Sequence, residues 1–424
     1  MCSNLLVRWF SSTASSVAFC GTIACLGALA AEPPKVVVKV VAGGESHLPA
    51  EKCRKMIVGP DVNQPDPFPG YGGFVGWECP VRLPGGTMYV SFSAGYWHAS
   101  PPTPLKYDAS HIASWKKIGF PADFVAPRGG RAMIVKSTDG GVTWTKPRTL
   151  LDTPNDDRHP AITALSDGTL LCSLFTYTGW PVESDDPSEV TGMAVIRSLD
   201  GGQTWDAVPR RMPPVPFKGG ATDGPPLELP DGSVLLAGYG RSEKLGKHVI
   251  GVFRSTDRGA TWQHLSTVVA DHDQFEPSMV RLDDGRLVMI TRPESAVTWS
   301  SDNGRSWTPP ATFGFRGYAH TLVVLDDGTL LCHYGCYNAG HLRAIFSTDG
   351  GKTWVAPAKD RGFLVDRTYG YSRSCLMPDG CAYLAYIGTG GHRLKDAQNN
   401  MIWSVKLRVR PDHSGIELVP VADN

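Results

Sequence analysis

Polar and aromatic side chains stand directly before six similar apolar hairpins of this chain, at corresponding positions. They include carboxylates, arginines, histidines and tyrosines, which transfer protons, bind polar substrates or act as nucleophiles. The six stretches are Trp77-Glu78-Cys79-Pro80, Asp157-Arg158-His159-Pro160, Asp223-Gly224-Pro225, Phe275-Glu276-Pro277, Tyr318-Ala319-His320 and Tyr369-Gly370-Tyr371-Ser372. If the hairpins surround one axis, these residues line a shared cavity. A purely structural repeat has little reason to gather such groups there.

The six hairpins share one pattern: an apolar strand, a turn containing Asp-Gly or Gly-Gly, and a second apolar strand. Such turns between apolar segments indicate tight β-hairpins, because glycine adopts positive φ without steric cost. The copies begin at Val81, Ile162, Leu227, Met279, Leu322 and Cys375. Each copy therefore predicts two antiparallel strands of a repeated sheet.

A second motif, Ser-x-Asp-x-Gly-x-Thr/Ser-Trp, occurs five times in the chain. Its aspartate can cap turn amides, its glycine can take positive φ, and its tryptophan can pack between neighbouring sheets. The copies are Ser137–Trp144, Ser198–Trp205, Ser255–Trp262, Ser300–Trp307 and Ser347–Trp354. Together the two motifs predict four-stranded antiparallel sheets at the spacing of propeller blades, and six hairpins predict six blades.

The last hairpin has no such motif after it, so the ends of the chain must complete its blade. We expect Met401–Val409 to add a third strand and the β-branched run Val36–Val41 to supply the outermost strand. Joining both ends in one blade would close the ring and remove its open edge. The predicted fold class is all-β: one six-bladed β-propeller domain over residues 31–424.

Composition excludes several classes of function. The 424 residues carry 41 Lys and Arg against 41 Asp and Glu, so no basic excess is available to bind nucleic acid. A hydrophobic content of 42% excludes wholesale disorder. The cysteines and histidines between Cys332 and His341 match no closed zinc site, so we expect neither a metal nor a cofactor.

The first thirty residues have the pattern of an export signal. Arg8 supplies a positive charge, Val17–Ala30 is a short apolar segment, and Ala28-Leu29-Ala30 is a small-x-small cleavage pattern. We therefore expect residues 1–30 to be a cleaved signal peptide and the protein to be secreted or periplasmic, rather than anchored as a lipoprotein. No stable membrane span is expected.

The five Ser-x-Asp motifs resemble the Asp boxes of sialidases, and the resemblance covers roughly residues 70–410. Asp boxes also occur in non-enzymatic propellers, so they indicate the fold and not the chemistry. The segment from Phe275 to Arg292 resembles the one that carries the family's tyrosine-activating glutamate and a substrate-binding arginine, which implies these roles for Glu276 and Arg292. The segment GYSRSCLMPDG resembles the one with the nucleophilic tyrosine, which falls on Tyr371, and Arg343 fits the family's other downstream arginine.

These residue types suit the chemistry that the resemblance implies. A sialoside carries a carboxylate on its anomeric carbon, which would repel an anionic nucleophile. A neutral tyrosine deprotonated by a neighbouring glutamate avoids that repulsion, and arginines bind the planar carboxylate through two hydrogen bonds. The resemblance therefore implies an exported, exo-acting glycoside hydrolase that removes terminal sialic or related acidic sugars from a glycan or glycoconjugate.

Two positions depart from the family pattern. Sialidases have an Arg-Ile-Pro motif in the first blade, whereas this chain has Glu78-Cys79-Pro80, and a carboxylate there would oppose a substrate carboxylate. The family's acid/base aspartate lies in the first blade, where this chain has a long insertion, Tyr96–Arg131. Of the two aspartates in the insertion, Asp108 and Asp123, we favour Asp123 as the acid/base.

Other candidate residues are predicted from their positions before or after the blade strands. We expect contacts with substrate from Glu78, Arg158, His159, Asp223 and His320 in the cavity wall, and from Trp97 and His98 as a sugar-stacking rim. His320 could equally be a base or a core histidine. Two other functions fit the same residues: a polysaccharide lyase acting on uronates, and a propeller that binds glycans without catalysis.

Overall fold

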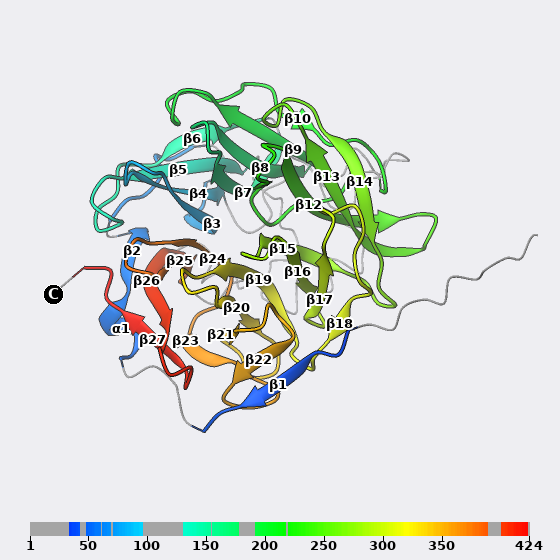
Figure 1. Cartoon of the computed structure of the whole chain (residues 1–424). Coiled ribbons are helices and arrows are strands. Elements are labelled where there is room, and N and C mark those ends of the chain that lie inside the picture. The colour runs from blue at the N-terminus through cyan, green and yellow to red at the C-terminus, as the bar shows by residue number, and fades with distance from the viewer. Residues whose placement is uncertain are drawn as a thin grey trace, which may run out of the picture. The chain divides into compact units, whose positions relative to one another are not determined.

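The computed structural model describes residues 34–42, 48–60, 62–68, 71–95, 130–153, 155–177, 191–217, 219–388 and 400–422. The segment Pro33–Asn424 forms one compact unit. Its strands form six sheets around a common centre, which confirms the predicted six-bladed β-propeller (Figure 1). The predicted signal peptide lies outside the described residues, and no helix among the described residues is long and apolar enough to cross a membrane.

Blades one to four are four-stranded antiparallel sheets whose strands follow one another in the chain. Blade one contains β3 (Phe74–Arg82), β4 (Met88–Gly95), β5 (Arg131–Ser137) and β6 (Arg148–Leu151). Blade two contains β7 (Asp156–Ala164), β8 (Leu170–Tyr177), β9 (Thr191–Ser198) and β10 (Arg210–Arg211). Blade three contains β11 (Leu227–Glu228), β12 (Val234–Ser242), β13 (Lys247–Ser255) and β14 (Gln263–Val268). Blade four contains β15 (Phe275–Arg281), β16 (Leu287–Arg292), β17 (Ala296–Ser300) and β18 (Ala311–Thr312).

Blades five and six also include strands from the ends of the chain. Blade five contains β19 (Gly317–Val324), β20 (Leu330–Cys336), β21 (Leu342–Ser347), β22 (Thr353–Ala356) and β23 (Phe363–Asp366), with β1 (Val37–Val40) at its edge. Blade six contains β24 (Ser372–Leu376), β25 (Ala382–Ile387), β26 (Ile402–Val409) and β27 (Ile416–Val419), with β2 (Lys55–Val58) beside β26. The single short helix α1 (Ala50–Cys53) in the described part of the chain precedes β2.

The closure of the ring differs in one respect from the sequence prediction. The run Val36–Val41 does not complete blade six, because β1 pairs in parallel with β22 at the edge of blade five. The N-terminal strand of blade six is β2, which pairs antiparallel with β26 and carries the fully buried Ile57 and Val58. The physical reason is burial: three of the four residues of β1 are exposed, so this strand suits an edge, whereas β2 brings apolar side chains to the core.

The Asp boxes join the third and fourth strands of their blades. They lie away from the hub, the central region that the innermost strands of the six blades surround. In the first box, Asp139 accepts hydrogen bonds from the backbone N–H groups of Val142 and Thr143 at 3.1 and 2.9 Å. Trp144 packs against Tyr383 of blade six, with ring centroids 6.5 Å apart. The boxes therefore stabilise turns and join neighbouring blades, as the sequence predicts.

The innermost strands of four blades contain a β-bulge at the same level. The register shifts in β3, β7, β15 and β19, and a non-glycine residue with positive φ lies in each shifted segment. These residues are Trp77, His159, Glu276 and Ala319, with φ between 46° and 54°. A bulge redirects side chains out of the regular alternation of a strand, and positive φ in such residues is uncommon enough to suggest a functional constraint. The repeated bulge thus turns side chains of separate blades toward the hub.

Candidate active site

Tyr371 and Glu276 meet at the hub although they are 95 positions apart in the chain. Tyr371 directly precedes β24 of blade six, and Glu276 lies at the bulge of β15 in blade four. The Tyr371 hydroxyl donates a hydrogen bond of 2.8 Å to Glu276 Oε1. The Glu276 side chain is only 2% exposed, so this bond is shielded from bulk water. The structure therefore brings together the phenol and the carboxylate that the sequence analysis predicts to act as nucleophile and base.

The phenol of Tyr371 is neutral and its ring is held in place. Burial, and then the nearby Glu276 carboxylate, raise the pKa of Tyr371 well above its ordinary value. The ring stacks on Tyr369 with centroids 5.5 Å apart. Gly370 between them has a φ of 98°, and a Cβ there would lie 2.6 Å from the Gly335 Cα, so only glycine fits. A base is needed to remove the hydroxyl proton.

The Glu276 carboxylate is bound on several sides. Arg292, the last residue of β16, lies with Nε 2.5 Å from Glu276 Oε2 and donates from Nη2 to Oε1 at 2.9 Å. The backbone N–H of Ala319, at the bulge of β19, donates to Oε2 at 2.9 Å. These contacts leave Oε1 directed at the Tyr371 hydroxyl and fix the carboxylate as an acceptor for its proton.

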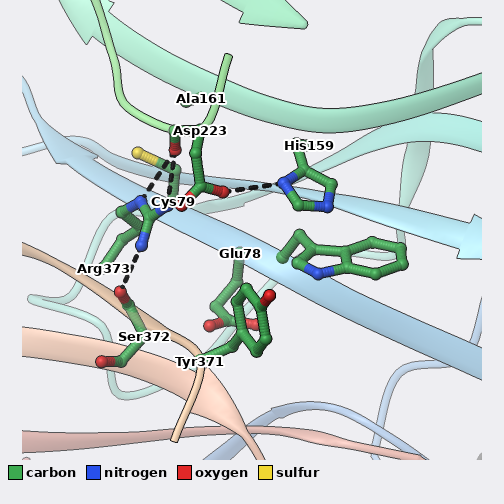
Figure 2. A pocket seen from close by; sticks show the side chains of 9 residues that line it. Glu78, Cys79, His159, Ala161, Asp223, Tyr371, Ser372 and Arg373 are labelled. Carbon is green, nitrogen blue, oxygen red and sulfur yellow. Dashed lines mark hydrogen bonds and ion pairs between the residues drawn. The ribbon is translucent and has the colours of Figure 1, made fainter. Parts of the chain in front are cut away.

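A second cluster of polar side chains at the hub is formed by residues of blades two, three and six (Figure 2). His159 Nδ1 lies 2.7 Å from Asp223 Oδ1, which is hydrogen-bonding distance. Arg373 of β24 forms an ion pair with the Asp223 carboxylate and donates to the Asp223 backbone carbonyl from Nε at 2.9 Å and Nη2 at 2.6 Å. Although burial opposes it, the Arg373 charge holds the pKa of Asp223 well below its ordinary value. Burial lowers the pKa of His159, so the imidazole is neutral near pH 7.

Glu78 differs from every other acidic residue at the hub. Its side chain is 1% exposed, and neither carboxyl oxygen makes a hydrogen bond with another described residue. Burial raises the pKa of Glu78 to about 8, with Arg373 acting in the opposite direction. At neutral pH this residue is therefore a carboxylic acid, which offers one O–H donor as well as acceptor oxygens.

Glu78, the His159–Asp223–Arg373 group and Tyr371 surround one pocket (Figure 2). It is lined by Trp77, Glu78, Cys79, His159, Ala161, Asp223, Tyr371, Ser372 and Arg373. The cavity has a volume of about 10 Å³, close to the minimum that holds one water molecule. Trp77 stacks on His159 with centroids 4.4 Å apart, and the Arg158 guanidinium lies 4.7 Å from the Trp77 ring centroid. Arg158 therefore packs against a wall residue of the pocket.

Two of the predicted site residues, Arg343 and His320, lie outside the lining of this pocket. Arg343 of β21 donates from Nε and Nη1 to the backbone carbonyls of Gly340 and Gly362, both at 2.9 Å. His320 is buried, with Nε2 2.8 Å from the Ser295 hydroxyl, its ring stacked on Tyr334 and its pKa lowered to about 3 by burial. Neither lines the pocket, so these contacts favour positioning roles over contact with substrate.

The remaining sequence candidates cannot be placed. Asp123, Trp97 and His98 lie outside the described residues. Among the residues that the structure does describe, no cluster of three or more His, Cys, Asp or Glu side chains is arranged for a metal ion.

Arg373 is a hub residue that the sequence reasoning missed. It stands two positions after Tyr371 in the segment Tyr371-Ser372-Arg373, and side chains two apart in a strand share a face. This alternation of side chains along a strand indicates that Arg373 faces the same way as Tyr371. Arg343 is predicted from its distance from Tyr371 along the chain, and this distance does not specify on which face of the sheet its side chain lies.

The chain belongs to the BNR repeat-like domain family, which matches residues 132–384. It is 28% identical over 259 residues to a sialidase of Micromonospora viridifaciens, covering 52% of this chain and 39% of that protein. It is 24% identical over 238 residues to a sialidase of Clostridium perfringens, covering 46% of this chain and 60% of that protein. The matches thus span less than two thirds of either relative. With its six blades, the chain is a sialidase-like BNR β-propeller.

Solved structures with the same fold differ in the activities that their names state. A protein of unknown function from Dyadobacter fermentans has a TM-score of 0.61 at 19% identity, covering 83% of this chain and 98% of that chain. A sialidase of Streptococcus pneumoniae has a TM-score of 0.57 at 12% identity, covering 82% and 70%. An α-L-arabinanase of Penicillium chrysogenum has a TM-score of 0.54 at 15% identity, covering 83% and 97%. These likenesses show the fold alone.

Proposed function

We propose that this protein is an exported, exo-acting retaining glycoside hydrolase of the sialidase type, with Tyr371 as nucleophile and Glu276 as its base. One observation carries the proposal: a neutral, partly buried phenol donates a 2.8 Å hydrogen bond to a buried carboxylate at the hub. This distance lies within the 2.6–3.2 Å range typical of a nucleophile and its base. The sialidases among its relatives support the same class of reaction.

In the first step the Tyr371 oxygen attacks the anomeric carbon of the terminal sugar. A bond forms between the tyrosine oxygen and that carbon, the hydroxyl proton passes to Glu276 Oε1, and the bond to the leaving oxygen breaks. The leaving oxygen takes a proton from a general acid, for which Asp123 is our sequence candidate. Arg292 and the Ala319 N–H hold Glu276 in position throughout.

In the second step water replaces the tyrosine. The water oxygen attacks the anomeric carbon, and its proton goes to the residue that acted as the acid. The Tyr371 oxygen leaves and takes its proton back from Glu276, which restores the resting hydrogen bond. Because each step inverts the anomeric carbon, the sugar is released with its original configuration.

Trapping the covalent intermediate tests this proposal. The full chain is incubated with activated fluorosugars, in sialic acid and neutral sugar forms, and digested for mass spectrometry. We expect a glycosyl adduct on the peptide that contains Tyr371, none in Tyr371→Phe, and a normal adduct in the control Tyr383→Phe, a buried tyrosine whose hydroxyl bonds to Gly141. An adduct elsewhere would refute Tyr371 as nucleophile.

Activity and binding assays separate the two alternatives. Unsaturated products that absorb in the ultraviolet, formed from a uronate polymer, would identify a lyase. Binding without turnover across glycosides of both charge types would identify a glycan-binding propeller. Either result would contradict the hydrolase assignment.

A further inference from the structure

We propose that the Glu78 side of the hub is a subsite for a hydroxyl group, so that the substrate is a neutral glycoside rather than one with a carboxylate on its anomeric carbon. This inference rests on the proposed function and names the substrate class of the same site. Three features of one pocket support it: a hydrogen-bond donor, a hydrogen-bond acceptor, and charged side chains that are already paired with one another.

The donor is Glu78. Its carboxyl group is buried, faces the pocket that Tyr371 also lines, and has no hydrogen-bond partner among the described residues. A buried polar group without a partner is costly and calls for an explanation. A substrate group that enters the pocket and bonds to Glu78 supplies one. Burial raises the pKa of Glu78 to about 8, which makes it a donor at neutral pH.

The acceptor is His159. Its Nδ1 bonds to the Asp223 carboxylate, which places the ring proton on Nδ1 and leaves a lone pair on Nε2. No hydrogen bond from Nε2 to a described residue is present. A hydroxyl group can accept from Glu78 and donate to His159. A carboxylate can only accept, so its oxygens would face the His159 lone pair without a proton between them.

The charges around the pocket lead to the same substrate class. Arg373 is paired with Asp223, and Arg292 is paired with Glu276. Arg158, which packs against Trp77, is paired with Asp156, so each of these three arginines already has a carboxylate partner. A substrate carboxylate would enter without a cation of its own, and an unpaired buried charge is costly. The sialidase resemblance would require an arginine where Glu78 stands.

The space at the subsite also suits a small group. The cavity of about 10 Å³ is close to the size of one water molecule, and hence of one hydroxyl group. Its wall is packed, because the Trp77 ring stacks on His159 and also contacts the Arg158 guanidinium. A planar carboxylate with two oxygens needs more room than a single hydroxyl.

The test compares aryl sialosides with neutral aryl pentosides and hexosides on the full chain. We expect kcat/KM for the best neutral glycoside to exceed that for the sialoside at least about 100-fold, as expected when a site's buried polar groups are matched by only one of two substrates. Three variants sharpen the result: Glu78→Gln, which keeps a donor and an acceptor, Glu78→Leu, which keeps neither, and Glu78→Arg, which adds a cation.

The variants differ in substrate preference. Glu78→Gln should keep the preference for the neutral sugar, and Glu78→Leu should lose about 10- to 100-fold in kcat/KM on it. Glu78→Arg should shift the preference toward the sialoside at least about 10-fold. Glu228→Gln is the matched control, because Glu228 does not line the pocket and accepts solvent-exposed hydrogen bonds from Ser166. Circular dichroism and thermal unfolding check that each variant folds, and the wild-type ratio decides the outcome if one does not.

The possible failures are distinguishable. If the wild type hydrolyses sialosides best, the neutral subsite is wrong and the hydrolase proposal stands. If it hydrolyses no glycoside, the hydrolase proposal fails, and calorimetric titration with neutral methyl glycosides and with free sialic acid then tests the subsite alone. Binding of neutral sugars that Glu78→Leu abolishes supports the subsite. Binding of sialic acid, or of neither sugar, overturns it.

Discussion

Blades one and four each bring a glutamate to the hub, in opposite environments and one position apart within the bulge, because Glu276 corresponds to Trp77, the residue before Glu78. Glu78 and Glu276 both lie at bulges of innermost strands, and both are almost fully buried. Glu276 is bound by Tyr371, Arg292 and a backbone N–H, whereas Glu78 has no partner among the described residues. The bulges of the two blades therefore each direct a carboxyl group to the hub, and the residues that face it from other blades decide its chemistry.

The largest effect expected is on the Glu276 side. Tyr371→Phe removes the nucleophilic oxygen and should lower kcat at least about 1,000-fold on any aryl glycoside that the wild type hydrolyses. Steady-state kinetics measure it, with the unfolding temperature as a check on the fold. A loss of less than tenfold would contradict Tyr371 as the nucleophile and Glu276 as its base.

Glu276→Gln should produce the next largest loss, about 100- to 10,000-fold in kcat, the contribution typical of a general base. The amide can still accept a bond from Tyr371, but it cannot take the proton. Comparing this loss with that of Glu78→Gln on the same substrate measures the difference between the two blades directly. Equal losses would mean that Glu78 takes part in the same proton transfer.

The pH dependence of stability tests the Glu78 side. The folded pKa of about 8 lies above the ordinary value of 4.5, so the folded chain keeps a proton that the unfolded chain releases in between. The free energy of unfolding should therefore fall as pH rises from about 5 to about 8, by up to about 1.4 kcal/mol per pH unit, and Glu78→Gln should lack this component.

Denaturant unfolding of both proteins at several pH values measures this difference. The titratable and charged groups that face Glu78 are Asp223, Arg373, His159, Cys79 and Tyr371. Asp223 stays ionised and Arg373 stays charged, the Cys79 thiol, whose pKa is raised to about 12, and the Tyr371 phenol stay neutral, and burial lowers the pKa of His159. Parallel pH profiles for the two proteins would contradict a protonated Glu78.

The smallest effect is expected outside the hub. Asp139→Ala removes the carboxylate that caps the first Asp box and should lower the free energy of unfolding by about 1 kcal/mol, with kcat unchanged. Chemical denaturation and the same kinetic assay measure both quantities. A change in kcat would show that the outer hairpins influence the hub, against the separation of structure and chemistry described above.

Much of the fold could be read from local patterns. The Asp-Gly hairpins and the boxes require particular turns, and each turn defines its strands through nearest neighbours in the chain. The closing strand was predicted incorrectly, as Val36–Val41 instead of β2, because a β-branched run can pair with any open edge. Which edge it meets depends on the path of the whole ring.

The candidate site could likewise be predicted only in part from local sequence patterns. Glu276, Arg292 and Tyr371 were found from motifs with a characteristic spacing, and the structure places them within hydrogen-bonding or ion-pair distance of one another. Arg373 was overlooked, and Arg343 lies against backbone carbonyls, because spacing along the chain does not specify which face of a strand points inward. The bulges with positive φ were also invisible in the sequence, although prolines follow soon after three of the four residues.

The amino-acid sequence by itself determined the repeat, the number of blades and the residue types that reach the hub, because these depend on turns and alternation over short distances. Only the tertiary structure decided which of those residues have partners. The charge of a buried carboxyl group depends on neighbours from other blades, so Glu78 and Glu276, which both lie at bulges of innermost strands, differ in their hydrogen-bond partners and in the chemistry open to them.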